Sequence, residues 1–150
     1  MTNDNEQHRI HRILDANFNR LREALRVVEE HYRFILEDEK ACVELKAMRH
    51  SLSEMERTVG QGLLLDGRDT ESDCFASESR PEEMGRENAE SILRANFKRA
   101  QEACRVIEEY AKLSAETESV SRQAKETRFS LYKMEKASLS GEKNLPPPRP

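Results

Sequence analysis

Two stretches of the sequence decide the fold. Residues 13–30 read ILDANFNRLREALRVVEE, and residues 92–109 read ILRANFKRAQEACRVIEE. The stretches are offset by 79 positions (92 minus 13), and 12 of the 18 aligned residues are identical, whereas unrelated sequences of this composition would share roughly one or two. The chain therefore contains a duplicated unit. The same offset, without a gap, gives further matches: Lys46 with Lys125, Arg49 with Arg128, residues 51–52 with 130–131, and residues 55–56 with 134–135.

Each copy of the unit is predicted to be a hairpin of two helices. Residues 1–59 contain no Gly or Pro that would interrupt a helix. A break is predicted near residues 37–39, followed by a second helix from about residue 39 to residue 59, which Gly60 and Gly62 end. The apolar residues of the first helix recur in alternating steps of four and three, which places them on one face: Leu14, Phe18, Leu21, Leu25, Val28 and Tyr32.

These patterns predict an all-α fold, a helical bundle of two duplicated hairpins related by a pseudo-twofold axis. We expect one folded domain over residues 1–137, followed by a disordered, Pro-rich tail or linker over residues 138–150. A helix start is predicted at Ser79 and the residues that follow it. Two such hairpins could also exchange between chains, so a homodimer stays open. The expected parts of the domain are repeat units at about 10–60 and 86–137 and a long central loop at 60–81.

The composition excludes several classes of protein. Of the 150 residues, 36% are charged, and the net charge is -4, so a general affinity for nucleic acid is not expected. No apolar run approaches the roughly 18 residues of a membrane-spanning helix, and the polar N-terminus lacks the apolar stretch of a signal peptide. The three cysteines are widely and unequally spaced, which predicts neither a disulfide framework nor a zinc site. We therefore expect a cytoplasmic protein without a nucleic-acid or membrane partner.

Both copies retain the same polar residues beside the apolar face. Arg49 and Arg128, on the second helix of each hairpin, could face the same edge. Neighbouring opposite charges along these helices could also be plain surface ion pairs. Retention of identical polar residues in both copies indicates a constraint, which either packing or chemistry could impose. On a helical projection, the flank of the apolar face holds an Asn, an Arg and a small Ala in each copy: Asn17, Arg20 and Ala24, then Asn96, Arg99 and Ala103.

The central loop contains an acidic segment, residues 65–73, which reads LDGRDTESD. We call it the acidic loop. Its spacing is too irregular for an EF-hand. A magnesium site that combines one or two carboxylates with phosphate oxygens of a substrate is open, with Asp69 and Asp73 as the candidate ligands. The alternative is a solvated loop without a ligand.

The combined motifs resemble a known family. They are residues 13–30, the Arg68-Asp69 pair with Asp73, and the second Ala-Asn motif that begins at Ala95. This pattern is similar to the all-helical domain that is found alone or fused in front of thiamine-phosphate synthase, over about residues 10–137. The resemblance implies an ATP-dependent phosphomethylpyrimidine kinase, a transferase of thiamine biosynthesis that converts hydroxymethylpyrimidine phosphate to its diphosphate. It also implies ATP, Mg²⁺ and the pyrimidine phosphate as ligands, and a thiamine-phosphate synthase domain or protein as a partner.

Under this interpretation, the site residues follow from the repeated positions and the acidic loop. The sequence has no P-loop and no Gly-rich kinase loop, but holding two anions in line requires mainly Arg, Lys and Mg²⁺. Asp69 and Asp73 are the expected metal ligands, and the expected catalytic residues are Arg20, Arg99 and Asp69. The expected substrate- or phosphate-binding residues are Asn17, Asn96, Lys46, Arg49, Arg68 and Arg128.

Two other functions stay open beside the kinase. The first is a non-catalytic helical module that docks to or regulates a thiamine-phosphate synthase. The second is a structural bundle whose repeated charges form ion pairs on its surface. The two Asn-Arg edges also allow two arrangements, one shared site or two separate sites.

Overall fold

The computed structural model describes residues 4–79 and 85–140, and it confirms the predicted all-α class. Within these residues, no helix combines the length and the apolar character that crossing a membrane requires. A π-helical turn extends the first helix, and two 3₁₀ turns precede the last. In chain order, the elements are α1 (Asp4–Glu30), the π-helical turn (His31–Ile35), α2 (Glu39–Val59), α3 (Gln61–Gly67), α4 (Ala89–Tyr110), the 3₁₀ turns (Ala111–Leu113 and Ala115–Thr117) and α5 (Glu118–Leu139).

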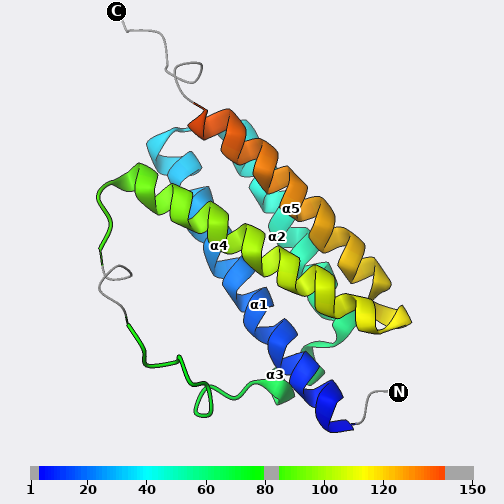
Figure 1. The fold of residues 1–150 in the computed structure, drawn as a ribbon. Helices are drawn as coiled ribbons and strands as arrows, with labels where there is room; N and C mark the ends of the chain where they lie inside the picture. The colour runs from blue at the N-terminus through cyan, green and yellow to red at the C-terminus, as the bar shows by residue number, and fades with distance from the viewer. Residues whose placement is uncertain (1–3, 80–84, 141–150) are drawn as a thin grey trace, which may run out of the picture.

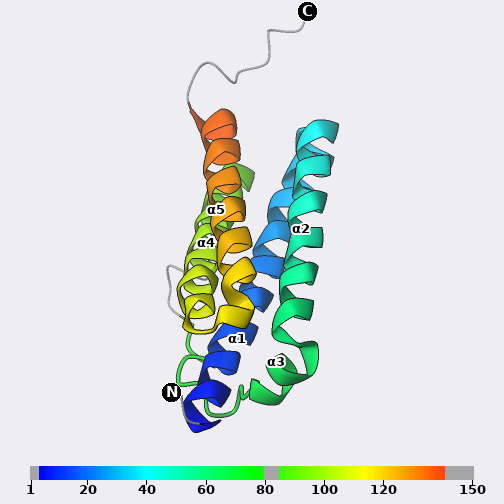
Figure 2. The same cartoon turned by 90° about the vertical axis from the view of Figure 1, so that its right-hand side faces the viewer.

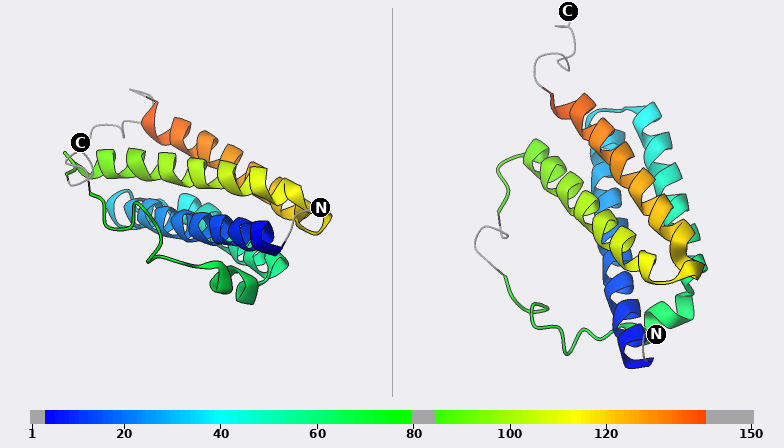
Figure 3. Two further views of the ribbon diagram at one scale, coloured as in Figure 1. Left: turned by 60° about the horizontal axis from the view of Figure 1, so that its bottom comes forward. Right: turned by 45° about the vertical axis from the view of Figure 1, so that its right-hand side comes forward.

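The four long helices form two layers, α1 with α2 and α4 with α5 (Figures 1 and 3). The first helices of the two pairs, α1 and α4, run in opposite directions and make the most extensive helix contact in the molecule. Figure 2 shows α2 alongside α1 and α5 alongside α4. The first sequence copy therefore lies on α1 and α2, and the second lies on α4 and α5.

The core lies between the two layers and is built from the predicted apolar faces. Phe18 and Phe97, which are equivalent at the offset of 79, are both buried at its centre. Tyr32 packs edge-on against Phe97 with ring centroids 6.4 Å apart, and its hydroxyl hydrogen-bonds to Ser138 of α5. Cys104 occupies the place that Leu25 has in the first copy, and burial raises the pKa of its thiol to about 12. Cys104 is thus a packing residue.

Side-chain caps fix the starts of two long helices. Asp38 accepts a hydrogen bond from the backbone N–H of Ala41 at 3.0 Å and starts α2 where the sequence predicted a break. Asn88 and Ser91 form a capping box that starts α4. The helix start expected at Ser79 falls on residues 80–84, which lie outside the described part of the chain; residues 85–88 precede α4 and are not helical. The predicted tail also lies outside the described part from residue 141 onward.

Two buried ion pairs at equivalent positions join the helices of each pair. Glu29 of α1 accepts a hydrogen bond from Arg49 of α2 at 2.9 Å, and Glu108 of α4 accepts one from Arg128 of α5 at 3.3 Å. The two glutamates are 8% and 3% exposed. Each glutamate also pairs with the arginine three residues before it in its own helix. This part of the repeated charge pattern is therefore structural.

The central loop predicted over residues 60–81 contains a helix, α3, which the sequence pattern did not indicate. The helix docks on the N-terminal half of α1. Arg68, directly after α3, donates two hydrogen bonds of 2.8 and 2.9 Å to the buried carboxylate of Asp15. Gly67 lies so close to α1 that a Cβ there would stand 2.9 Å from the backbone nitrogen of Arg12. The position of α3 thus depends on the missing side chain of Gly67.

Gly67→Ala is therefore expected to destabilise the protein by about 1–3 kcal/mol, because a backbone atom of α1 cannot move aside for the new methyl group. The measurement is the free energy of unfolding in urea. Gly62→Ala in the same helix is the matched control, since nothing lies within 4 Å of a Cβ there, and alanine favours helix. Equal stabilities of the two variants would contradict the close packing of α3 on α1.

Glu108→Gln is expected to lower the free energy of unfolding by about 2–3 kcal/mol, because it leaves the Arg128 guanidinium buried without its counter-charge. Glu29→Gln should cost less, since the side chains of the first pair are 27% and 10% exposed, compared with 14% and 3% in the second pair. A larger loss in Glu29→Gln would contradict this assignment.

The ion pair between Glu108 and Arg128 also makes the stability of the folded protein depend on pH. Burial alone would raise the pKa of Glu108, but hydrogen bonds from Arg105 and Arg128 hold it below its usual value of 4.5. A carboxyl whose pKa is lowered in the folded state contributes stability above its unfolded pKa and loses it as pH falls through the folded pKa. The wild-type protein should therefore lose more stability than Glu108→Gln when the pH is lowered from 6 through this range.

Candidate functional site

A pocket of about 500 Å³ lies between α1 and α4. Its ten lining residues are five pairs at the offset of 79, so each repeat contributes the same five side chains. The two Asn-Arg edges, which lie on helices that run in opposite directions, therefore line one shared pocket. We call it the inter-repeat pocket; its pairs are Asn17 with Asn96, Arg20 with Arg99, Glu23 with Glu102, Ala24 with Ala103, and Val27 with Val106.

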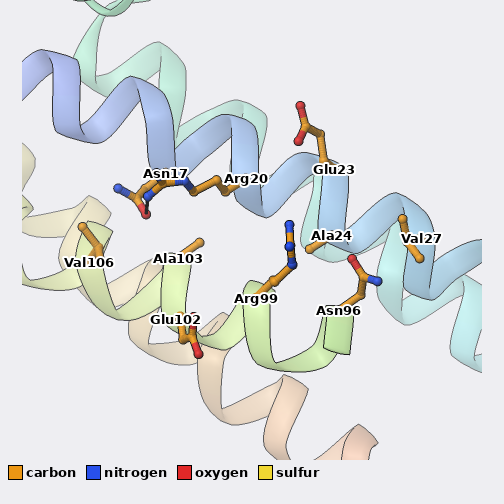
Figure 4. A pocket seen from close by; sticks show the side chains of 10 residues that line it. All are labelled: Asn17, Arg20, Glu23, Ala24, Val27, Asn96, Arg99, Glu102, Ala103 and Val106. Atoms are coloured by element: carbon orange, nitrogen blue, oxygen red, sulfur yellow. Dashed lines mark hydrogen bonds between the residues drawn. The ribbon is translucent and has the colours of Figure 1, made fainter. Parts of the chain in front are cut away.

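The inter-repeat pocket has two polar ends (Figure 4). Asn17 and Arg20 of α1 lie opposite Ala103 of α4, and their counterparts in α4 lie opposite Ala24 of α1. Both alanines are 2% exposed, as expected where two helices pack closely. The small side chains leave room for the arginine of the facing helix. Each end of the pocket therefore combines an Asn-Arg pair from one repeat with an alanine from the other.

The asparagines are anchored to their own helices. The side-chain amides of Asn17 and Asn96 each donate to the carbonyl four residues earlier, at 2.9 Å in both cases. The Oδ1 atom of Asn17 then accepts a hydrogen bond of 3.4 Å from the Arg20 guanidinium. Asn17 thus holds Arg20 in place.

The charges of the pocket are not paired with one another. In the described part of the chain, neither Arg20 nor Arg99 has an ion-pair partner, and the helical pair between Arg20 and Glu23 is not formed. Figure 4 shows the carboxylates of Glu23 and Glu102 directed away from the gap between the helices. Both guanidiniums are exposed to solvent. The pocket therefore offers two available guanidiniums, whose planar fork of N–H donors matches phosphate or carboxylate oxygens.

The structure does not bring the other predicted substrate-binding residues to this pocket. Arg49 and Arg128 are engaged in the ion pairs with the buried glutamates. Lys46 lines a separate pocket on α2, of about 630 Å³, together with Arg49. Arg68 is bound by Asp15. The sequence left open that Arg49 and Arg128 face the same edge as Arg20, but their glutamate partners hold them elsewhere.

The acidic loop lines a separate pocket on α1, which shares only Glu23 with the inter-repeat pocket. A hydrogen bond from the backbone N–H of Ser72 lowers the pKa of Asp69. Arg12 donates to the backbone carbonyl of Asp69 at 2.7 Å and ties the loop to α1. Residues 4–79 and 85–140 hold no group of three or more metal-ligating side chains. A magnesium ion at the predicted ligands would thus take most of its oxygens from water or a phosphate.

Val27 and Val106 of the pocket were not predicted, although the sequence carries a signal for them. Asn17, Arg20, Ala24 and Val27 recur in steps of three, four and three, and all four are identical in the second copy. This is a second helical stripe beside the apolar core face. Arg12 was also missed, because its contact with the acidic loop is a tertiary one.

Several proteins similar to this chain are named thiamine-phosphate synthase. The one from Thermosynechococcus vestitus is 43% identical over 132 residues, which are 88% of this chain and 36% of the relative. The one from Nostoc punctiforme is 37% identical over 84% of this chain and 34% of the relative, and the one from Gloeobacter violaceus is 38% identical over 91% and 38%. The chain thus spans about a third of the length of these relatives. No solved structure matches it.

These names contradict the kinase activity. The resemblance implied an ATP-dependent phosphomethylpyrimidine kinase, whereas the relatives are named as a synthase. They also give no support to ATP as a ligand. The kinase interpretation is therefore corrected, and the matches favour the alternative, a helical module associated with thiamine-phosphate synthase. The expected place in thiamine biosynthesis agrees with them.

A family model identifies the family to which the chain belongs. The model described as the ThiD2 family matches residues 12–137. These residues include both sequence repeats, the acidic loop and the whole inter-repeat pocket. The chain therefore belongs to the ThiD2 family, a helical domain associated with thiamine-phosphate synthase.

Proposed function

We propose that this chain is a non-catalytic helical module that docks on thiamine-phosphate synthase and regulates it through a phosphorylated small molecule bound in the inter-repeat pocket. The observation that carries the proposal is the contrast among the repeated arginines. Arg49 and Arg128 are bound by buried glutamates, whereas Arg20 and Arg99 face a shared pocket and form no ion pair within the described residues, although Glu23 and Glu102 also line it. Arginines held at a pocket without an internal partner are suited to an external anion.

The pocket is suited to binding a small molecule. Its volume of about 500 Å³ lies within the range of about 300–1,000 Å³ that is usual for such ligands. The side chains that line it belong to Asn, Arg, Glu, Ala and Val alone. The arginines supply the charge for a phosphate, and the alanines and valines supply an apolar floor.

An exposed apolar segment at one end of the bundle supports docking. Phe34, Ile35 and Leu36 are 63%, 57% and 50% exposed. The equivalent residues 113–115 of the second copy are Leu-Ser-Ala, so the packing shared by the two repeats does not require this apolar triplet. The same segment forms the π-helical turn, and Glu37 behind it has a φ of +51°; both features are frequent at functional sites. We assign this segment as the surface that contacts the synthase.

The proposal predicts that two kinds of substitution act differently. Phe34→Ser with Ile35→Ser should abolish co-elution of this chain with the thiamine-phosphate synthase of the same organism, because it removes the exposed apolar surface. Arg20→Gln with Arg99→Gln should leave co-elution intact but remove the effect of the chain on the rate at which the synthase forms thiamine phosphate. The measurements are size-exclusion chromatography of the mixture and the rate with and without the chain.

Matched controls are available for both variants. Phe75→Ser changes an equally exposed phenylalanine, at 65%, in the central loop. Arg122→Gln removes an exposed arginine on α5 that is paired with Glu118. Neither control should change binding or rate. If the wild-type chain neither binds the synthase nor changes its rate, the proposed function is wrong.

A further inference from the structure

The inter-repeat pocket presents the same chemistry from both of its ends. Each of the five lining residues in α1 has an identical counterpart in α4. A ligand that lies across the pseudo-twofold axis therefore meets an arginine, an anchored asparagine and an alanine at either end. Such an arrangement is complementary to a molecule whose two ends are chemically alike.

The donors that remain for a ligand are mainly guanidinium N–H groups. The asparagine amides are anchored on the carbonyls of their own helices at 2.9 Å. Arg20 has Asn17 as its partner at 3.4 Å, and Arg99 has no hydrogen-bond partner in the described part of the chain. Figure 4 places the two guanidiniums at different positions along the pocket, one on the side of Ala103 and the other on the side of Ala24. The pocket thus has two separate places for negative charge.

We infer that the inter-repeat pocket binds one ligand with two anionic phosphate groups, one held by Arg20 and the other by Arg99. The ligand is a short carbon skeleton with a phosphate at each end, because the two ends of the pocket are alike and its two guanidiniums lie apart. This inference rests on the proposed function, because it specifies the ligand of the same pocket. It also gives the stoichiometry, which is one ligand for each chain.

The size and charge of the pocket indicate that the two phosphate groups belong to one molecule. Two separate phosphates in about 500 Å³ would repel each other, with only one guanidinium available to each. In a linked ligand, binding of the first group makes binding of the second an intramolecular event, so the entropy of association is lost once. Ala24 and Ala103 line the pocket beside the two guanidiniums, where they would contact the linking atoms, and the valines lie farther out toward its two ends.

Calorimetric titration of the intact chain tests this inference with three probes: orthophosphate, inorganic pyrophosphate and a four-carbon α,ω-bisphosphate. The bisphosphate should bind with a stoichiometry of one and at least tenfold more tightly than orthophosphate. Pyrophosphate should bind less tightly than the bisphosphate, and the opposite order would contradict two separated phosphates. Arg20→Gln and Arg99→Gln should each weaken this binding by about tenfold or more, and by similar factors, because each removes one charged hydrogen-bonding group.

The control for these titrations is Arg122→Gln, which should bind the linked probe like the wild-type chain. Circular dichroism of every variant separates lost binding from lost helix. Two equivalents of orthophosphate bound as tightly as the linked probes, or a loss confined to one arginine, would overturn the inference while leaving the proposed function standing. If no phosphate probe binds to the folded chain but the synthase is still bound and regulated, the inference is wrong by itself. If the synthase is also unaffected, both are wrong.

Discussion

The packing of α1 against α4 is the contact on which the rest of the structure depends. Ala24 and Ala103 lie buried in this contact, where small side chains allow two helix backbones to approach closely. Because the helices share a sequence pattern and run in opposite directions, the contact resembles an isologous interface within a single chain. Each of the five pocket residues therefore occurs twice, and the Asn-Arg pair of either helix faces the alanine of the other. A pocket lined by five matched pairs is the direct result.

The repeated polar residues divide into two groups with different physical roles. Glu29 with Arg49, and Glu108 with Arg128, point toward the second helix of their own pair and hold the two helices together. A buried carboxylate of this kind is costly unless it is paired, which explains why both members persist in both copies. Arg20 and its counterpart point toward the other repeat, where they have no such partner. Packing thus accounts for the first group and leaves the second group without a structural explanation.

The sequence predicted most of the fold, because its main signals are local or periodic. The repeat is visible as two matching stretches of 18 residues, and the apolar residues recur at short intervals within each helix. The start of α2 likewise depends on a contact between Asp38 and Ala41, three residues apart. Helix α3 could not be predicted in this way, because it is placed by contacts of Gly67 and Arg68 with α1, more than fifty residues away along the chain. The pocket residues Asn17 and Arg20 followed from their repetition. The assignment of Arg49 to the same edge did not hold, since repetition alone does not distinguish an arginine with a buried partner from one without.

A symmetric pocket can regulate a partner only if the two repeats differ elsewhere, and the differences lie on the side of α1. The acidic loop is tied to α1 through Arg12, and the exposed segment that begins at Phe34 continues directly from the C-terminal end of α1. The second copy differs at the equivalent positions: residues 144–150, at the offset of 79 from the start of the acidic loop, read NLPPPRP, and residues 113–115 carry one large apolar side chain instead of three. A helix moves largely as a rigid body when a ligand shifts its packing. A ligand held by both α1 and α4 would therefore act on the apolar segment through α1 itself, which makes that helix the physical connection between the symmetric pocket and the asymmetric surface.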